Sequence, residues 1–97
     1  MEFVIKSIEP KNKYVVNKYY RVITGRECDV LHLMTGMVAV LLVDVPYDPG
    51  CPHHYRTTPV RENRIDEDGT IVFETENSVY TLVPSKKEVT DENIRKD

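Results

Sequence analysis

The sequence lacks a hydrophobic run long enough to cross a membrane. Its longest apolar stretch, from Met37 to Val43, has seven residues, whereas a membrane-spanning helix needs about 20. The first residues, Met1 to Lys6, are too few and too charged to form a secretory signal peptide. We therefore expect a protein that makes no contact with a membrane.

Cysteine is also scarce. Cys28 and Cys51 are the only two cysteines, which is too few for the disulfide framework that holds many small secreted domains together. We expect both side chains to be reduced thiols. The sequence therefore predicts a cytoplasmic protein, either in the cell that makes it or in the cytoplasm of a host cell, because both compartments keep thiols reduced.

No charge of one sign dominates the chain. Thirteen Lys and Arg against sixteen Asp and Glu give a net charge of −3, which argues against an overall positive field that would attract nucleic acid. The charge is uneven, because residues 1–26 hold six basic and two acidic side chains, while residues 27–83 hold three basic and ten acidic ones. This acidic body favours a partner that has a basic surface.

The short motifs of common enzyme families are absent. The sequence contains no G-x-S-x-G, no H-E-x-x-H and no phosphate-binding P-loop. Cys51 is too close to His53 and His54 in the chain to orient a thiolate–imidazolium pair readily, and no glycine-rich oxyanion loop accompanies them. We predict that the protein is not an enzyme and needs no cofactor.

Short β-rich segments separated by turns make up most of the chain. β-branched, aromatic and apolar residues without a long helical period predict strands at residues 3–8, 13–24, 28–33, 37–43, 60–65, 70–75 and 78–83. Residues 28–33 could instead form one helical turn; we favour the strand. The sequence therefore predicts a mainly β fold, a small antiparallel barrel or sandwich of the SH3-like or OB-like kind. One domain spans residues 1–83, and the charged residues 84–97 form a disordered or weakly helical tail.

The apolar run from Met37 to Val43 is the predicted centre of the core, because a strand that is apolar along its whole length needs cover on both faces. The rest of the chain has few apolar residues to spare for this cover. We therefore predict a homo-oligomer, most simply a dimer. The expected core side chains are Val38, Val40, Leu42, Ile71, Phe73 and Leu82.

Residues 44–59 stand apart, because they hold four of the six prolines and two of the three histidines. Proline fixes φ and removes a backbone donor, so this segment predicts a stiff loop rather than a central strand. A loop of this length is typical of a functional site, and aromatic and arginine side chains anchor interfaces. The candidate binding residues are therefore Tyr47, His53, His54, Tyr55 and Arg56.

Cysteine and histidine side chains offer a different interpretation, a tetrahedral zinc site. The candidate ligands are Cys28, His32, Cys51 and His53. Their spacing matches no zinc finger or zinc ribbon. We favour the competing interpretation, in which Cys28 is a small core residue and the other three are polar surface residues, and so expect no bound metal.

Cations and tyrosines alternate near the N-terminus. β platforms that bind single-stranded nucleic acid combine stacked aromatic rings with cations. The candidate basic face consists of Lys11, Lys13, Lys18 and Arg21, interleaved with Tyr14, Tyr19 and Tyr20. The competing interpretation is a strand whose tyrosines pack inward and whose lysines protect an exposed edge, and the acidic remainder of the domain favours it.

The C-terminal part of the domain carries a resemblance. Residues 56–60 read Arg-Thr-Thr-Pro-Val, and residues 70–82 read Thr-Ile-Val-Phe-Glu-Thr-Glu-Asn-Ser-Val-Tyr-Thr-Leu. This hairpin resembles the ending of short uncharacterised β-rich proteins that bacteriophages and prophages encode. The resemblance is confined to this hairpin; it implies a phage-type accessory protein with a small β fold and assigns no catalytic residues.

These observations predict a non-enzymatic protein-interaction module, a phage-encoded accessory protein or an inhibitor of host defence that binds a partner protein. Two alternatives stay open. One is a protein that binds or sequesters a nucleotide-type ligand, with Arg56, His53 or the N-terminal lysines on the phosphate. The other is a single-stranded nucleic-acid binder that uses the basic N-terminal strands.

Overall fold

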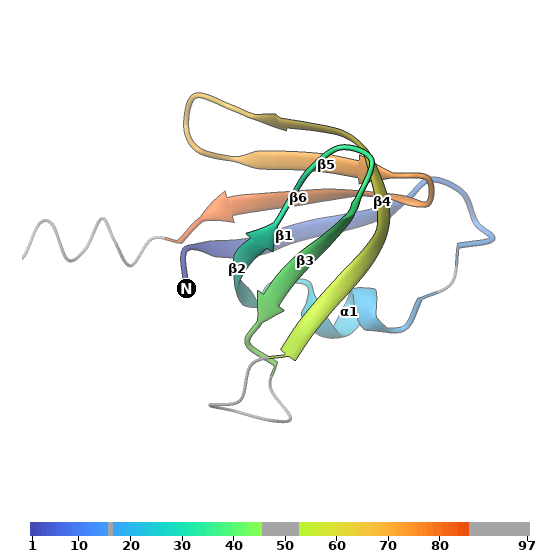
Figure 1. Cartoon of the computed structure of the whole chain (residues 1–97). Coiled ribbons are helices and arrows are strands. Elements are labelled where there is room, and N and C mark those ends of the chain that lie inside the picture. The colour runs from blue at the N-terminus through green and yellow to red at the C-terminus, as the bar shows by residue number, and fades with distance from the viewer. Residues whose placement is uncertain (16, 46–52, 86–97) are drawn as a thin grey trace, which may run out of the picture.

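The computed structural model describes residues 1–15, 17–45 and 53–85. Within these residues, six antiparallel strands follow one another around a closed barrel in chain order, which confirms the predicted small β-barrel (Figure 1). A short helix lies in the connection from the first strand to the second. The elements are β1 (Phe3–Pro10), α1 (Tyr19–Ile23), β2 (Glu27–His32), β3 (Val38–Val43), β4 (His53–Ile65), β5 (Ile71–Thr75) and β6 (Ser78–Pro84).

The barrel closes through a long pairing of β1 with β6, from Phe3 opposite Pro84 to Pro10 opposite Ser78. One residue beyond β6, the Ser85 N–H donates a 2.8 Å hydrogen bond to the Glu2 carbonyl oxygen. Residues 86–97, the remainder of the predicted tail, lie outside the described part of the chain. No helix of the described residues has the length and apolar character needed to cross a membrane.

The core fills the barrel with side chains from every strand. Ile71, Phe73 and Leu82 are buried, as predicted. The Phe73 ring stacks on the Tyr80 ring at 4.7 Å between centroids. The other buried apolar residues are Ile5, Ile23, Cys28, Ala39, Leu41, Val43, Val45 and Val60.

The predicted orientation of β3 is wrong by one residue. Ala39, Leu41 and Val43 point into the core, whereas Val38, Val40 and Leu42 lie on the outer face, where Val38 is exposed and the other two are half-buried. Side chains alternate between the two faces of a strand, so a shift of one residue exchanges the whole set. Both sets of this run are apolar, and the sequence therefore could not show which one faces inward.

Residues 13–24 do not form the predicted strand, because α1 occupies the second half of this segment. Asn17 lies just before the N-cap residue, Lys18. Its side-chain oxygen accepts a 2.9 Å hydrogen bond from the Tyr19 N–H, and its carbonyl oxygen accepts one from the Tyr20 N–H. Tyr20 and Ile23 lie three residues apart and pack toward the core. A helix of five residues is too short to show a helical period in the sequence.

Residues 53–59 do not belong to a loop, because β4 begins at His53 and runs through Pro59. The first half of β4 pairs with β3, and the second half, from Val60 on, pairs with β5. Pro59 lies where one pairing ends and the other begins, beside an irregularity in the β3–β4 register. A proline is tolerated there because the missing N–H falls at a break in the ladder. Residues 46–52, with Tyr47 and Cys51, lie outside the described part of the chain.

Candidate binding site

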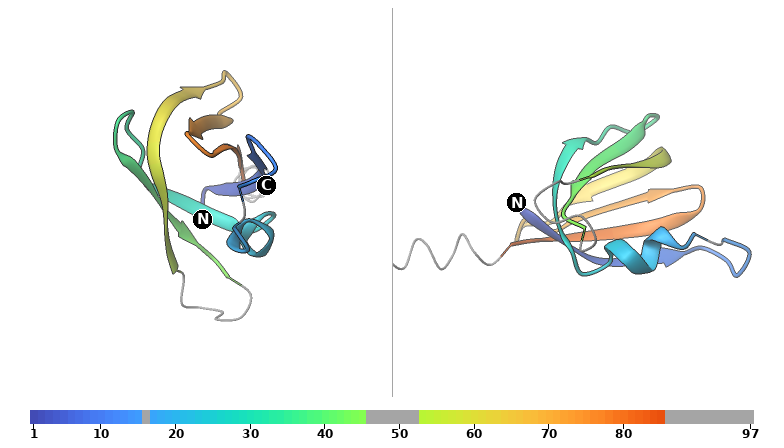
Figure 2. Two further views of the ribbon diagram at one scale, coloured as in Figure 1. Left: turned by 90° about the vertical axis from the view of Figure 1, so that its right-hand side faces the viewer. Right: turned by 90° about the horizontal axis from the view of Figure 1, so that it is seen from below.

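A cavity of about 450 Å³ lies between α1 and the first half of β4. In Figure 1, α1 lies next to the lower part of β4, where this strand begins, and Figure 2 shows the two elements from two further sides. Four of the five predicted binding residues, His53, His54, Tyr55 and Arg56, line this cavity. We call it the α1–β4 groove. The structure thus brings the predicted residues together on a strand instead of on a loop.

The groove has an apolar floor and a polar rim. Ile23 from α1 and Val43 and Val45 from the end of β3 line it, and all three are buried. Asn17 and Tyr19 add the helix side of the wall, and Tyr19 is half exposed. An apolar floor with a few polar groups at the rim is the usual composition of a binding cavity.

Tyrosine hydroxyls connect the elements near the groove: Tyr20 links α1 to β6, and Tyr55 links β4 to β6. The Tyr20 hydroxyl lies 2.7 Å from Ser78 Oγ, and the Tyr55 hydroxyl lies 3.2 Å from that of Tyr80. Burial is the main reason that the pKa values of Tyr55 and Tyr80 are raised, and the bond from Tyr55 raises that of Tyr80 further. These hydroxyls stay neutral at physiological pH, so they act as hydrogen-bonding groups.

Arg56 is the only described residue of the groove lining that carries a formal charge at pH 7. No carboxylate belongs to the groove lining among the described residues. The exposed Arg56 guanidinium makes no hydrogen bond or ion pair within the described part of the chain, which distinguishes it from Arg26, Arg61 and Arg64. An arginine fork with this freedom suits a carboxylate or a phosphate.

The candidate zinc ligands are not gathered in one place. Cys28 on β2 and His53 on β4 flank opposite edges of Val43, which separates their backbones by about 10 Å. His32 lies opposite Val40, farther along the barrel, and Cys51 lies outside the described residues. Burial raises the pKa of the Cys28 thiol to about 12, so this side chain stays protonated. No group of three or more potential ligands able to hold a metal ion exists among the described residues.

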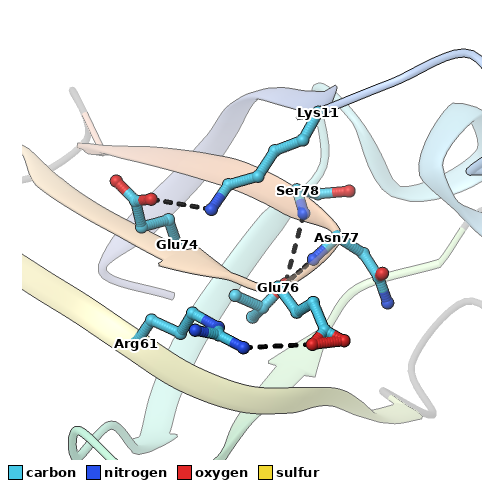
Figure 3. A network of polar contacts seen from close by, with 7 residues as sticks. Lys11, Arg61, Glu74, Glu76, Asn77 and Ser78 are labelled. Carbon is cyan, nitrogen blue, oxygen red and sulfur yellow. Dashed lines mark hydrogen bonds and ion pairs between the residues drawn. The ribbon is translucent and has the colours of Figure 1, made fainter.

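The predicted basic face is dispersed over a turn and a helix. Lys11 is paired with Glu74 on β5 at 2.7 Å, in a surface network that also contains the Arg61–Glu76 pair (Figure 3). Lys13 and Lys18 lie over the rings of their neighbours, exposed Tyr14 and Tyr19. Lys18 and Arg21 line a second, more open hollow of about 770 Å³ between α1 and β1. The strand platform expected for these residues is therefore not present.

A second surface lies on the outer side of β2 and β3. Leu31, Met34, Met37 and Val38 are 38–55% exposed and fall within one eight-residue stretch at the end of the β2–β3 hairpin. The outer face of β3 extends this surface with half-buried Val40 and Leu42. We call these six residues the outer apolar surface. Arg56 lies opposite Val40 and His54 opposite Leu42 on β4, so two predicted binding residues border it.

Sequence reasoning missed the residues that complete both surfaces. Asn17 before a short run of tyrosines was a detectable helix-start signal, and it would have placed Tyr19 and Ile23 on a helix. No sequence pattern indicated that Val45 lines the groove, because the groove forms only where α1 approaches β4. The exposure of Met34 and Met37 depends on how the hairpin end lies on β4, where the Gly36 N–H donates to the Val60 carbonyl oxygen.

Comparison with protein-family models, with curated proteins and with solved structures found no match. The resemblance to phage-encoded proteins therefore stays a hypothesis, and the function must be argued from the surfaces themselves.

Proposed function

We propose that this protein is a non-enzymatic interaction module that binds a partner protein through the outer apolar surface. One observation carries the proposal. Four of the seven large hydrophobic side chains that are exposed in the described residues, Leu31, Met34, Met37 and Val38, lie within eight consecutive residues.

Exposing this cluster of apolar side chains to water is unfavourable, and binding of a partner that covers them lowers the free energy. Apolar surface gains about 25 cal/mol for each Å² taken out of water, and contiguous exposed patches mark sites of interaction. Methionine suits a docking surface because its flexible thioether adapts to the partner. Arg56 and His54 at the border supply polar contacts that fix orientation.

The experiment compares three forms of the chain as bait in extracts of the organism that encodes it. These are the wild type, the double variant Leu31→Glu/Met37→Glu, and the control Ile65→Glu. Ile65 is 69% exposed at the far end of β4, so the control introduces a charge at an exposed apolar position away from the surface. We expect the double variant to lose a bound protein that the wild type and Ile65→Glu retain.

Three results would contradict the proposal. The first is equal capture by all three baits, provided that circular dichroism shows them folded. The second is a wild-type dimer in light scattering that Met37→Glu dissociates; the surface then serves the predicted self-association. The third is capture of nucleic acid with a steep salt dependence, which would favour the nucleic-acid alternative.

A further inference from the structure

The two halves of β4 differ in how their edges are occupied. Residues 60–65 pair with β5, but residues 54–58 pair only with β3, and none of the described residues pairs with their other edge. An edge of this kind presents backbone N–H and C=O groups that are ready to pair with another extended chain. Tyr55 and Thr57 point inward, whereas His54, Arg56 and Thr58 are exposed.

The α1–β4 groove includes part of this segment, because His54, Tyr55 and Arg56 line it. A chain that paired with residues 54–58 would therefore lie in the groove, with α1 as the opposite wall. Its side chains would alternate between two faces. Every second one would reach the floor of Ile23, Val43 and Val45, which accommodates an apolar side chain.

Charge decides between the possible occupants. The groove lining contains Arg56 and two histidines and, among the described residues, no carboxylate. A second copy of this chain that paired antiparallel through the same edge about a two-fold axis at Arg56 would place the two Arg56 side chains opposite one another, which is unfavourable. A segment that carries Asp or Glu places carboxylates there instead.

We infer that the edge of β4 over residues 54–58 binds an extended acidic segment of a partner protein as an added strand, with an apolar side chain on the groove floor. This mode derives affinity from backbone hydrogen bonds and specificity from alternate side chains. It uses the strand edge and the groove floor in place of the apolar side chains of the outer apolar surface, and it shares with that surface only the bordering His54 and Arg56.

The test uses the full chain as bait for a random library of displayed 12-residue peptides. We expect enriched peptides that alternate apolar residues with Asp or Glu. The best peptide is then synthesised, and its affinity is measured by fluorescence anisotropy. We expect at least a tenfold loss for Arg56→Glu. The matched control is Arg64→Glu, which makes the same change of charge on the same strand, beyond the groove, and should bind like the wild type.

Two further measurements test the added strand directly. A peptide N-methylated at alternate residues keeps its charge but loses backbone donors, and we expect it to bind at least tenfold more weakly. Amide hydrogen exchange should become slower in residues 54–58 when the unmodified peptide binds. The double variant Leu31→Glu/Met37→Glu should bind the peptide normally, which separates this inference from the proposed function.

Several results would overturn the inference. The added-strand inference is wrong if no peptide is enriched. It is also wrong if neither N-methylation of the peptide nor Arg56→Glu weakens binding. Full amide protection of residues 54–58 in the peptide-free monomer means that another part of this chain occupies the edge. A dimer that Arg56→Glu does not change means that a second copy occupies it. Binding of ADP with Arg56 dependence, without any peptide binding, identifies a nucleotide pocket instead.

Discussion

The two sides of the barrel differ in how many apolar side chains and backbone groups they leave exposed to solvent. On β5 and β6 every second residue is buried, and ion pairs such as Lys11–Glu74 and Arg61–Glu76 hold the surrounding surface. On β2, β3 and the first half of β4, large apolar side chains are exposed and one edge has no described strand partner. Both sides contribute buried residues to the core, but only the second side combines them with a cluster of exposed apolar side chains and a described strand edge that are available for binding.

The largest expected effect is on the β5–β6 side. Phe73 is completely buried and stacked on Tyr80, so Phe73→Ala should lower the free energy of unfolding by about 3–5 kcal/mol. Met37→Ala, at a half-exposed position of the other side, should change it by less than about 0.5 kcal/mol. Urea denaturation measures both values, and equal losses would abolish the distinction between the two sides.

The next effect tests the orientation of β3. Leu41 is completely buried and its neighbour Leu42 is only half-buried. Leu41→Ala should therefore cost about 2–5 kcal/mol and Leu42→Ala clearly less. The two variants remove the same atoms from adjacent residues, so their difference in melting temperature reports orientation alone. A larger loss for Leu42→Ala would mean that β3 is turned the other way.

A pH effect should follow from the buried Cys28. Its pKa is raised from 9.0 to about 12 in the fold, chiefly by burial, so between these values the unfolded chain loses a proton that the folded chain keeps. Stability is then unaffected below pH 9 and falls as the pH rises toward 12, by about 1.4 kcal/mol per pH unit. Cys28→Ala should remove this slope in denaturation curves measured from pH 8 to 10; at higher pH the raised pKa values of Tyr55 and Tyr80 add a slope of their own. If Cys28→Ala leaves the slope unchanged, titratable groups other than Cys28 cause the loss of stability.

The smallest effect concerns the attachment of α1. Tyr20→Phe removes one hydroxyl and its 2.7 Å contact with Ser78 Oγ, and should cost about 0.5–1.5 kcal/mol. The unfolding midpoint in urea checks this value. Ser78→Ala is the matched partner substitution, and the double variant should cost less than the sum of the two single ones. Additive losses would mean that the two hydroxyls do not interact.

The sequence predicted those parts of the fold in which local pattern and burial agree. Ile71 and Phe73 alternate with Thr70, Val72 and Glu74, and Leu82 follows Thr81, so both the β5–β6 hairpin and its inward face could be predicted. β3 could be predicted as a strand but not oriented, because an apolar run gives the same pattern on both faces.

The candidate site was predicted by residue type and not by geometry. Arg56 and His54 were recognised because such side chains anchor interfaces, but four prolines in residues 44–59 indicated a loop where the structure has the first half of β4. The groove arises from the approach of Ile23 and Tyr19 to β4 across long stretches of sequence. No local pattern encodes such a contact.

The aromatic composition of the groove gives the protein a spectroscopic signal of its own. The chain has six tyrosines and no tryptophan, so tyrosine emission is not masked by transfer to an indole. Tyr19 and Tyr55 line the groove, and the Tyr55 hydroxyl contacts that of Tyr80. A carboxylate that enters the groove and accepts a phenol hydrogen bond quenches this emission, so a tryptophan-free ligand can be titrated against the unlabelled protein.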